Sequence, residues 1–340
     1  MTKNGPQLTN ASPLHVAIAS YPGAQATCIH GLTDLFMYAD YFAREHAANA
    51  RPVVRVTHWR HSADGDALEC AYDSDPGPLG KPVVVIVPAC QMAPPKTALA
   101  PQSVSWVRQR HAEGAVVAAV CGGVFLLAES GLLAGRRATT HWMFAQELAR
   151  RFPDLDVDPD RLVIDESDVI TAGGVLAWAD LGLSLVERLL GPAVMCTTAR
   201  FMLMDPPGRE QRIYGEFTPH LLHGDKVILS VQHWLQTNSA ATCTVSSLAE
   251  RAHLSERTFL RRFTKATGVK PSEYHQRLRV ARSRELLEFT RDSVEQVAAA
   301  AGYEDPGGFR RIFKRVVGLS PAEYRRRFQR AAQAQAQGAR

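Results

Sequence analysis

The last third of the chain contains an internal repeat with a period of about 50 residues, so any fold it adopts has to contain the same unit twice. When the two copies are aligned, two phenylalanines spaced four residues apart coincide, followed by a glycine, a proline and a tyrosine. The matching pairs are Phe259 and Phe309, Phe263 and Phe313, Gly268 and Gly318, Pro271 and Pro321, and Tyr274 and Tyr324. Each copy predicts a short helix, a turn of about three residues and a second helix.

Start and stop signals predict where these helices begin and end. Ser255 and Asp305 can open the two second helices, and Gly268 and Gly318 can close them in the left-handed conformation. Helix-opening capping boxes are expected at Ser247 with Glu250, Ser293 with Gln296, and Ser320 with Glu323.

The second helix of each copy is expected to carry a cationic outer face, because the phenylalanines define its buried face. The outward basic residues are Arg257, Arg261 and Lys265 in one copy, and Arg310, Arg311, Lys314 and Arg315 in the other. In a helix-turn-helix such a helix enters the DNA major groove, where arginine bridges guanine acceptors and other cations neutralise phosphates. The alternative is a helical bundle with solvated arginines.

The charge distribution favours the DNA-binding interpretation. Residues 242–340 hold 20 basic and 10 acidic residues, whereas residues 1–241 hold 19 basic and 24 acidic ones. The net charges are therefore +10 and −5. This asymmetry predicts a near-neutral or acidic sensor or enzyme joined to a module that binds a polyanion.

The first part of the chain alternates buried strands with helical patterns, which predicts an α/β domain with a mainly parallel sheet covered by helices. The predicted strands are His15–Ser20, Val53–Trp59, Val83–Pro88, Val116–Val120 and Asp168–Ala172. The pattern stops at a Pro-Pro-Gly cluster, and an all-helical region follows. We therefore expect an α/β domain over 12–204, a linker over 205–224, an all-α domain over 225–329 and a flexible tail over 330–340.

Other sequence features predict a cytoplasmic protein without a metal or cofactor. The longest apolar stretch, 115–128, is shorter than the roughly 20 residues of a membrane-spanning helix, and no secretory signal is visible. The six cysteines lie far apart without a Cys-x-x-Cys pair, which argues against a zinc site or a disulfide framework. Reduced, mostly buried thiols are expected.

One pattern in the α/β part is typical of a reaction site. The stretch AVCGGVFLLA at 119–128 places Cys121 between a buried strand and a helix, among small residues, as a nucleophile elbow requires. The helix end is expected to favour the thiolate, with the Gly122 amide facing an oxyanion and His141 as the candidate base. Open α/β sheets bind ligands at this edge, so the same residues predict a ligand site or, alternatively, ordinary core.

The repeat region closely resembles the signature of the AraC/XylS family of bacterial regulators. The similarity is clearest in DPGGFRRIFKRVVGLSPAEY at 305–324 and extends over about residues 226–328. It implies two recognition helices in successive major-groove turns of double-stranded DNA. The contacts it implies fall on Arg257, Thr258, Leu260, Arg261, Lys265, Gly307, Arg310, Arg311 and Lys314. Because Gly307 and Gly308 lack side chains, the second helix is expected to depend more on phosphate contacts.

The α/β part resembles the amidase-like domain of the class I glutamine amidotransferase superfamily, in the PfpI-like branch that includes isonitrile hydratase. The resemblance rests on the elbow, on AESGLLAGRRATTHW at 128–142 and on ITAGG at 170–174. It implies a flavodoxin-like fold. The ligand site it implies contains Ala89, Cys90, Cys121, Gly122, His141, Trp142, Gly173 and Gly174.

Together the two parts resemble the GlxA-type transcriptional regulators over nearly the whole chain. That resemblance implies that the former enzyme domain senses a small molecule and forms a homodimer. We therefore expect a DNA-binding activator whose effector is an amino-acid or amine derivative. Trp142 or Trp178 would stack on a quaternary ammonium group.

Departures from the family pattern argue against catalysis. Cys28 stands at the place of a family aspartate, Leu32 at that of a proline and Asp34 at that of a glutamate, while PACQ at 88–91 replaces Pro-Gly-Gly. No third group that would orient His141 is evident, although a triad needs one. No enzyme activity is expected.

Two alternatives remain at this point. One is a cysteine-dependent hydrolase or hydratase of amides or isonitriles with a tethered DNA-binding domain. The other is a dimerisation scaffold in which Cys121 senses oxidation.

Overall fold

The computed structural model describes residues 12–47, 51–65, 67–91, 94 and 101–338, with the backbone alone for 330–338. The chain forms two compact units, one ending at Gln211 and the other beginning at Arg212. This division lies inside the segment 205–224 that the sequence predicts as the linker.

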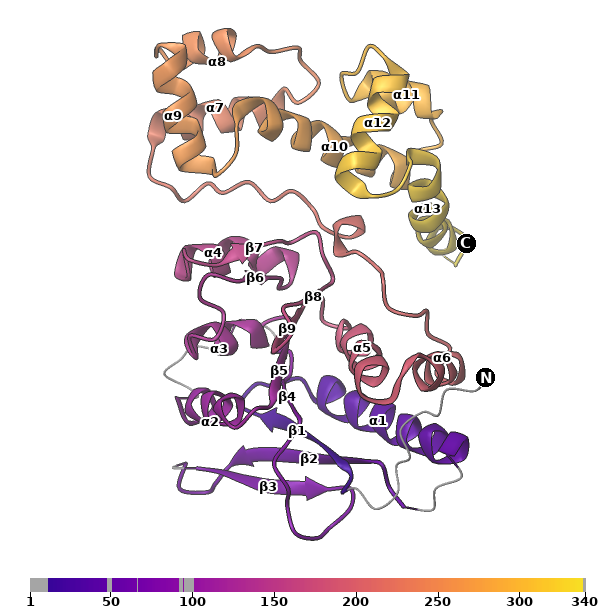
Figure 1. Cartoon of the computed structure of the whole chain (residues 1–340). Coiled ribbons are helices and arrows are strands. Elements are labelled where there is room, and N and C mark those ends of the chain that lie inside the picture. The colour runs from indigo at the N-terminus through magenta and orange to yellow at the C-terminus, as the bar shows by residue number, and fades with distance from the viewer. Residues whose placement is uncertain (1–11, 48–50, 66, 92–93, 95–100, 339–340) are drawn as a thin grey trace, which may run out of the picture. The chain divides into compact units, whose positions relative to one another are not determined.

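The first unit is built around a seven-stranded sheet in the order β3-β2-β1-β4-β5-β9-β8 (Figure 1). Its five central strands are parallel, and β3 and β8 are antiparallel edges. The strands are β1 Leu14–Ser20, β2 Val54–His61, β3 Leu68–Asp73, β4 Val84–Val87, β5 Val116–Val120, β8 Val163–Asp165 and β9 Val169–Ala172. A separate pair consists of β6 Arg137–Ala138 and β7 Asp156–Val157.

Helices cover both faces of this sheet, so its central strands are buried on both sides. Val16 and Ile18 of β1 face the core shared with α1, α5 and α6, whereas Ala17 and Ala19 face the core shared with α2 and α3. The helices are α1 Ala26–Ala47, α2 Pro101–Ala112, α3 Gly123–Glu129, α4 Ala145–Arg151, α5 Trp178–Leu190 and α6 Pro192–Phe201. This is the covered, mainly parallel α/β sheet that the sequence predicts.

The sequence prediction missed β3, β6, β7 and β8. β3 is an edge strand in which half of the residues are exposed and none is buried, and the others are two or three residues long. None of them carries the continuous apolar run that marks a buried strand.

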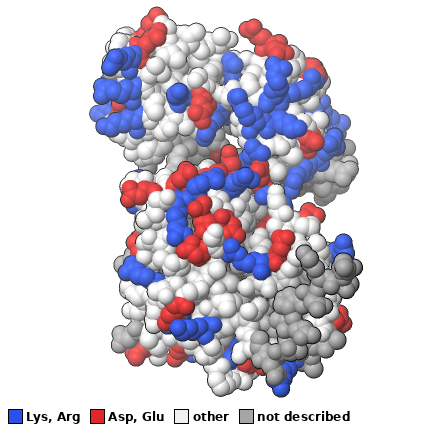
Figure 2. All heavy atoms as spheres, viewed as in Figure 1, with Lys and Arg blue, Asp and Glu red and all other residues white. Residues whose placement is uncertain are grey.

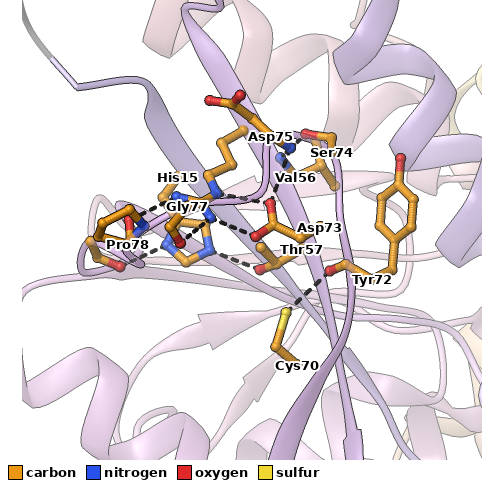
Figure 3. Close-up of polar contacts among 12 residues, drawn as sticks. His15, Val56, Thr57, Cys70, Tyr72, Asp73, Ser74, Asp75, Gly77 and Pro78 are labelled. Atoms are coloured by element: carbon orange, nitrogen blue, oxygen red, sulfur yellow. Dashed lines mark hydrogen bonds and ion pairs between the residues drawn. The ribbon is translucent and has the colours of Figure 1, made fainter.

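A polar cluster fastens β3 and the loop after it to the sheet (Figure 3). The guanidinium of Arg55 donates to both carboxylate oxygens of Asp73, at 2.8 and 2.5 Å, and to the carbonyls of Gly77 and Pro78 at 2.9 Å. His15 bridges the carbonyl of Gly80, at 2.9 Å, and the hydroxyl of Thr57, at 2.8 Å. The cluster satisfies buried polar groups beside an edge strand, and we assign it a structural role.

Acid is expected to destabilise the first unit through His58. The Nε2 of His58 lies 2.7 Å from the hydroxyl of Thr33, and burial, assisted by the nearby His30, lowers the pKa of His58 from 6.5 to about 4. The unfolded chain therefore takes up a proton near pH 6.5 that the folded chain resists until near pH 4. The contribution of neutral His58 to the free energy of unfolding is fully present above pH 6.5 and is lost as the pH falls from 6.5 toward about 4.

Thermal melts at pH 7 and pH 5 test this expectation. The melting temperature should fall by about 4 °C or more in the acid, and the fall should be smaller in His58→Gln. The same pH dependence in both proteins would show that His58 is not the responsible group.

The second unit is helical, and no strand occurs in its described part, residues 212–338. Its helices are α7 Lys226–Thr237, α8 Val245–Arg251, α9 Glu256–Thr267, α10 Pro271–Phe289, α11 Val294–Ala300, α12 Pro306–Val317 and α13 Pro321–Gly338. The pairs α8–α9 and α11–α12 are the two predicted helix-turn-helix units, joined by α10 (Figure 1).

The sequence repeat reappears as a repeated core. Phe259, Phe263, Phe309 and Phe313 are fully buried. The ring of Phe263 meets that of Tyr274 nearly at right angles, at 5.3 Å, and Phe313 meets Tyr324 in the same way at 5.5 Å. Each helix-turn-helix therefore has its own hydrophobic core, to which α10 contributes at both ends.

Most of the predicted helix ends are confirmed. Ser255 and Asp305 cap α9 and α12, and Gly268 and Gly318 end them in the left-handed conformation. The boxes at Ser293 with Gln296 and at Ser320 with Glu323 both form. The box predicted at Ser247 with Glu250 is wrong, because α8 starts earlier and Thr244 pairs with Ser247. Helix α13 extends to Gly338, through most of the segment expected to be a flexible tail.

Candidate functional sites

Cys121 occupies the predicted elbow. It lies between β5 and α3 with a φ of 53°, in the left-handed region that non-glycine residues rarely adopt. Its backbone is held on both sides, because its N–H donates to Ala172 at 2.7 Å and its carbonyl accepts from the Thr140 hydroxyl at 2.7 Å. The strand-to-helix turn therefore has the geometry expected from the sequence.

The small residues after Cys121 are required by the segment that follows β4, which lies directly against them. A Cβ added at Gly122 would lie 2.0 Å from the sulfur of Cys90, and one at Gly123 would lie 2.3 Å from the carbonyl oxygen of Pro88. The end of β4 thus packs directly against the start of α3. Close packing alone explains both glycines.

The thiol of Cys121 differs from the sequence expectation. The side chain is 1% exposed, and burial raises the pKa of Cys121 to about 12, with a further rise from Cys90. The backbone N–H groups of Gly122 and His141 oppose this rise but do not overcome it. The expected thiolate is therefore wrong, because desolvation of the charged form outweighs the helix end.

The imidazole of His141 is used for helix capping. Its Nδ1 accepts from the Met143 N–H at 3.2 Å, at the start of a short 3₁₀ helix, and its ring lies against Trp142 and Phe144. Burial lowers the pKa of His141. It is the backbone N–H of His141, and not its imidazole, that opposes the rise in the pKa of Cys121. Asp34 is exposed on α1, so it does not replace the missing acid.

The remaining residues of the predicted ligand site are largely buried. The Ala89 carbonyl accepts from Gln25 at 2.7 Å, and Cys90 forms a β-bridge with Ala24. Trp142 is half-buried and Gly174 is half-exposed at the same edge of the sheet. Trp178 is partly buried and packs against Gly31, where a Cβ would lie 2.5 Å from its ring, and this close packing argues against a role in ligand stacking.

No sequence motif marks Gln211, which the structure places in this site. Its carboxamide reaches Gly173, where a Cβ would lie 2.5 Å from the Gln211 nitrogen. It also hydrogen-bonds to the segment 139–142, beside Cys121. The sequence prediction counted Gln211 as part of the linker.

The predicted DNA-contacting residues lie mostly on exposed helix faces. Most of them are exposed, and Thr258 and Gly307 are half-buried. The exposed ones are Arg257, Leu260, Arg261, Lys265, Arg310, Arg311 and Lys314. Figure 2 shows lysine and arginine gathered over the second unit. Both helices therefore present a cationic face opposite their buried phenylalanines.

The two cationic faces differ in their acidic partners. Among the described residues, neither Arg257 nor Arg261 forms a salt bridge, whereas on α12 Arg310 pairs with Glu295 and Arg311 lies 3.5 Å from Asp305. Asp305 also accepts from the amides of Gly307 and Gly308, at 2.8 and 2.7 Å. The guanidinium of Arg311 lies near both glycines, since an added Cβ would be 3.6 or 3.7 Å from its nitrogens.

Two negative findings bound the chemistry of the described residues. No group of three or more histidine, cysteine, aspartate or glutamate side chains among them is arranged to hold a metal ion. None of the described helices is both long and apolar enough to cross a membrane.

Comparison with known proteins agrees with both units. A model of the DJ-1/PfpI family matches residues 72–188, and a model of a helix-turn-helix domain matches residues 248–327. The HTH-type transcriptional regulator CdhR of Pseudomonas aeruginosa is 29% identical over 242 residues, covering 68% of this chain and 69% of CdhR. The regulator GlxA of Rhizobium meliloti is 27% identical over 217 residues, covering 63% and 66%.

A third relative bears on the enzyme alternative. Isonitrile hydratase of Pseudomonas putida is 38% identical over 92 residues, but these cover only 26% of this chain and 38% of the hydratase. The matches to transcriptional regulators extend over both units. The chain therefore combines a DJ-1/PfpI domain with an AraC-type helix-turn-helix domain, and in this combination it matches the GlxA-type transcriptional regulators.

Proposed function

We propose that this protein acts in the cytoplasm as a transcriptional activator that binds double-stranded DNA through α9 and α12 and responds to a small molecule through its first unit. The observation that carries this proposal is the duplicated helix-turn-helix. Two separate cores hold two short helices, and both expose arginines opposite their buried phenylalanines.

The residues on the two helices suggest different tasks. On α9, we assign Arg257 and Arg261 to guanine edges, Leu260 to a thymine methyl group, and Thr258 and Lys265 to phosphates, because these side chains lie on the helix opposite its buried phenylalanines. On α12, Gly307 lets the backbone approach the DNA, while Arg310, Arg311 and Lys314 supply positive charge.

Hydroxyl-radical footprinting of the full chain on DNA from its own promoter region tests this proposal. Two protected patches on one face of the duplex, about 10 base pairs apart, are expected if each helix occupies a successive turn of the major groove. A single patch would rule out the double insertion, and no protection would overturn the proposed function.

We propose that the first unit is a sensor without enzyme activity, and that its effector is an amino-acid or amine derivative. The neutral buried thiol of Cys121 and the capping role of His141 support the first point, because nucleophilic catalysis needs an activated thiol and a free base. Isonitrile or amide turnover that is lost in Cys121→Ser would favour the alternative, a tethered hydrolase or hydratase.

We propose that the first unit also forms a homodimer, in which a second copy covers an aromatic patch on α1 and α6. Tyr41 and Phe201 are 49% and 57% exposed, and Tyr38 and Phe42 pack against Phe201. Exposed aromatic patches of this kind are typical of interfaces, and a dimer would bring two DNA-binding units to adjacent sites.

Phe201→Glu is expected to shift the protein from dimer to monomer, because it places a charge in the apolar contact. Sedimentation equilibrium measures this shift, and Phe289→Glu, an exposed apolar residue of the second unit, is the matched control. Unchanged dimerisation of Phe201→Glu would exclude this patch as the interface.

A further inference from the structure

The carboxamide of Gln211 is buried in a polar cradle of the first unit. Gln211 is 2% exposed. Its side-chain nitrogen donates to the carbonyls of Thr140 and Arg161, at 2.8 and 3.1 Å, and to the hydroxyl of Thr139 at 3.0 Å. Its side-chain oxygen accepts from the Trp142 N–H at 3.3 Å. Every polar atom of the carboxamide is therefore matched.

The cradle is built for a group that both donates and accepts. The Thr139 hydroxyl donates to the Arg161 carbonyl at 2.8 Å, which leaves its oxygen free to accept from Gln211. Three acceptors thus face the nitrogen and one donor faces the oxygen. A carboxylate would place a negative oxygen against two carbonyls, whereas a primary carboxamide satisfies all four partners.

The two residues before Gln211 are fastened to the same unit. The Arg209 guanidinium forms a two-point salt bridge with Asp180, whose side chain is 3% exposed. Glu210 pairs with Arg161 at 3.3 Å and forms a β-bridge with it. The segment 209–211 is therefore bound to the first unit by side chains and backbone.

The next residue belongs to the second unit. The carbonyls of Arg212 and Gly215 both accept from Arg284 of α10, which is 7% exposed, the former at 2.9 Å. No residue separates the segment held by the first unit from the segment held by the second. A displacement of Gln211 is therefore passed directly to the chain that enters the DNA-binding unit.

We propose that residues 209–211 form a latch, and that the cradle is a binding site for the primary carboxamide group of a small ligand, which displaces Gln211. The inference rests on the proposed function, since it names the regulated element of the sensor unit. The ligand and Gln211 need the same four partners, so binding and latch opening are one event. A ligand that fits only the open state shifts the equilibrium toward it.

Chemical rescue tests the cradle directly. Gln211→Ala removes CH₂–CONH₂, the framework of acetamide, and Gln211→Glu keeps the side-chain length but loses the amide donors. In the full chain without DNA, we expect trypsin to cleave the Arg212–Ile213 bond at least tenfold faster in both variants than in the wild type. Acetamide should restore resistance in Gln211→Ala, and N,N-dimethylacetamide, which lacks N–H groups, should not.

Gln109→Ala is the matched control, because Gln109 bonds on the exposed surface of α2 with Glu113 and should not affect cleavage. Unchanged cleavage in both Gln211 variants, or equal rescue by the two amides, would overturn the proposal. Hydrogen exchange at Trp142 gives a second readout, since its N–H loses its acceptor in Gln211→Ala and should exchange faster.

Operator binding then separates the latch from the proposed function. Gln211→Ala should change the affinity for promoter DNA at least tenfold, and acetamide should reverse the change. Successful rescue of cleavage with unchanged DNA affinity would refute the latch while leaving DNA binding intact. If the wild-type protein binds no DNA, the proposed function fails, although the cradle is still confirmed by the cleavage assay.

Discussion

Replacing Arg257 and Arg261 together with alanine is expected to lower the affinity for promoter DNA about 100-fold or more, because each lost base contact costs roughly 1–3 kcal/mol. The same change at Arg310 and Arg311 should cost less. The α12 arginines are paired with Glu295 and Asp305 in the free protein. Because these ion pairs have to break before the arginines contact DNA, part of the binding free energy of the DNA contacts is offset. Fluorescence anisotropy at one fixed salt concentration measures both variants.

The control for this experiment is the double change Arg150→Ala and Arg188→Ala. Both residues lie on the surface of the first unit, and their replacement removes two positive charges, as the replacements on α9 and α12 do. Their loss should leave affinity within a few-fold of wild type. Equal losses from the α9 and α12 pairs would contradict the difference that we derive from the ion pairs.

Gly123→Ala is expected to destabilise the first unit by about 3 kcal/mol or more, since its Cβ has to displace backbone. The added carbon would lie 2.3 Å from the carbonyl oxygen of Pro88 and 2.9 Å from that of Val87. Moving these atoms disturbs β4, a central strand of the sheet. Urea unfolding, followed by the fluorescence of the first unit's tryptophans, measures the effect.

Gly80→Ala is the matched substitution, because nothing lies within 4 Å of its added Cβ. It should change the free energy of unfolding by less than about 1 kcal/mol. A Gly123→Ala protein as stable as Gly80→Ala would show that α3 does not pack against the end of β4 as described.

The second unit was predictable from sequence because its signals are local and occur twice. Phe263 with Tyr274 and Phe313 with Tyr324 are each eleven residues apart, in the second helix of a helix-turn-helix and in the helix that follows it. Ser255 and Asp305 cap the helix that follows them directly. The error at Ser247 arose because serines and threonines occur on both sides of the start of α8, and their spacing alone does not identify the cap.

The candidate site in the first unit was only partly predictable, because its properties depend on contacts distant in sequence. The position of Cys121 follows from a local motif, but the state of its thiol depends on burial by the surrounding sheet and helices. Gln211 fills the site from about 70 residues after His141, and no periodicity reports such a contact. β3 was missed because its exposed side chains lack the apolar pattern.

Specific DNA binding by the two cationic helices can be tested with a salt series. Equilibrium binding of the full chain should be measured on promoter DNA and on a scrambled duplex of the same composition. We predict that log K falls linearly with log salt on both, and that promoter DNA is bound at least about 1000-fold more tightly at physiological salt. Weak binding that does not distinguish the two duplexes would show that α9 and α12 do not recognise a specific DNA sequence.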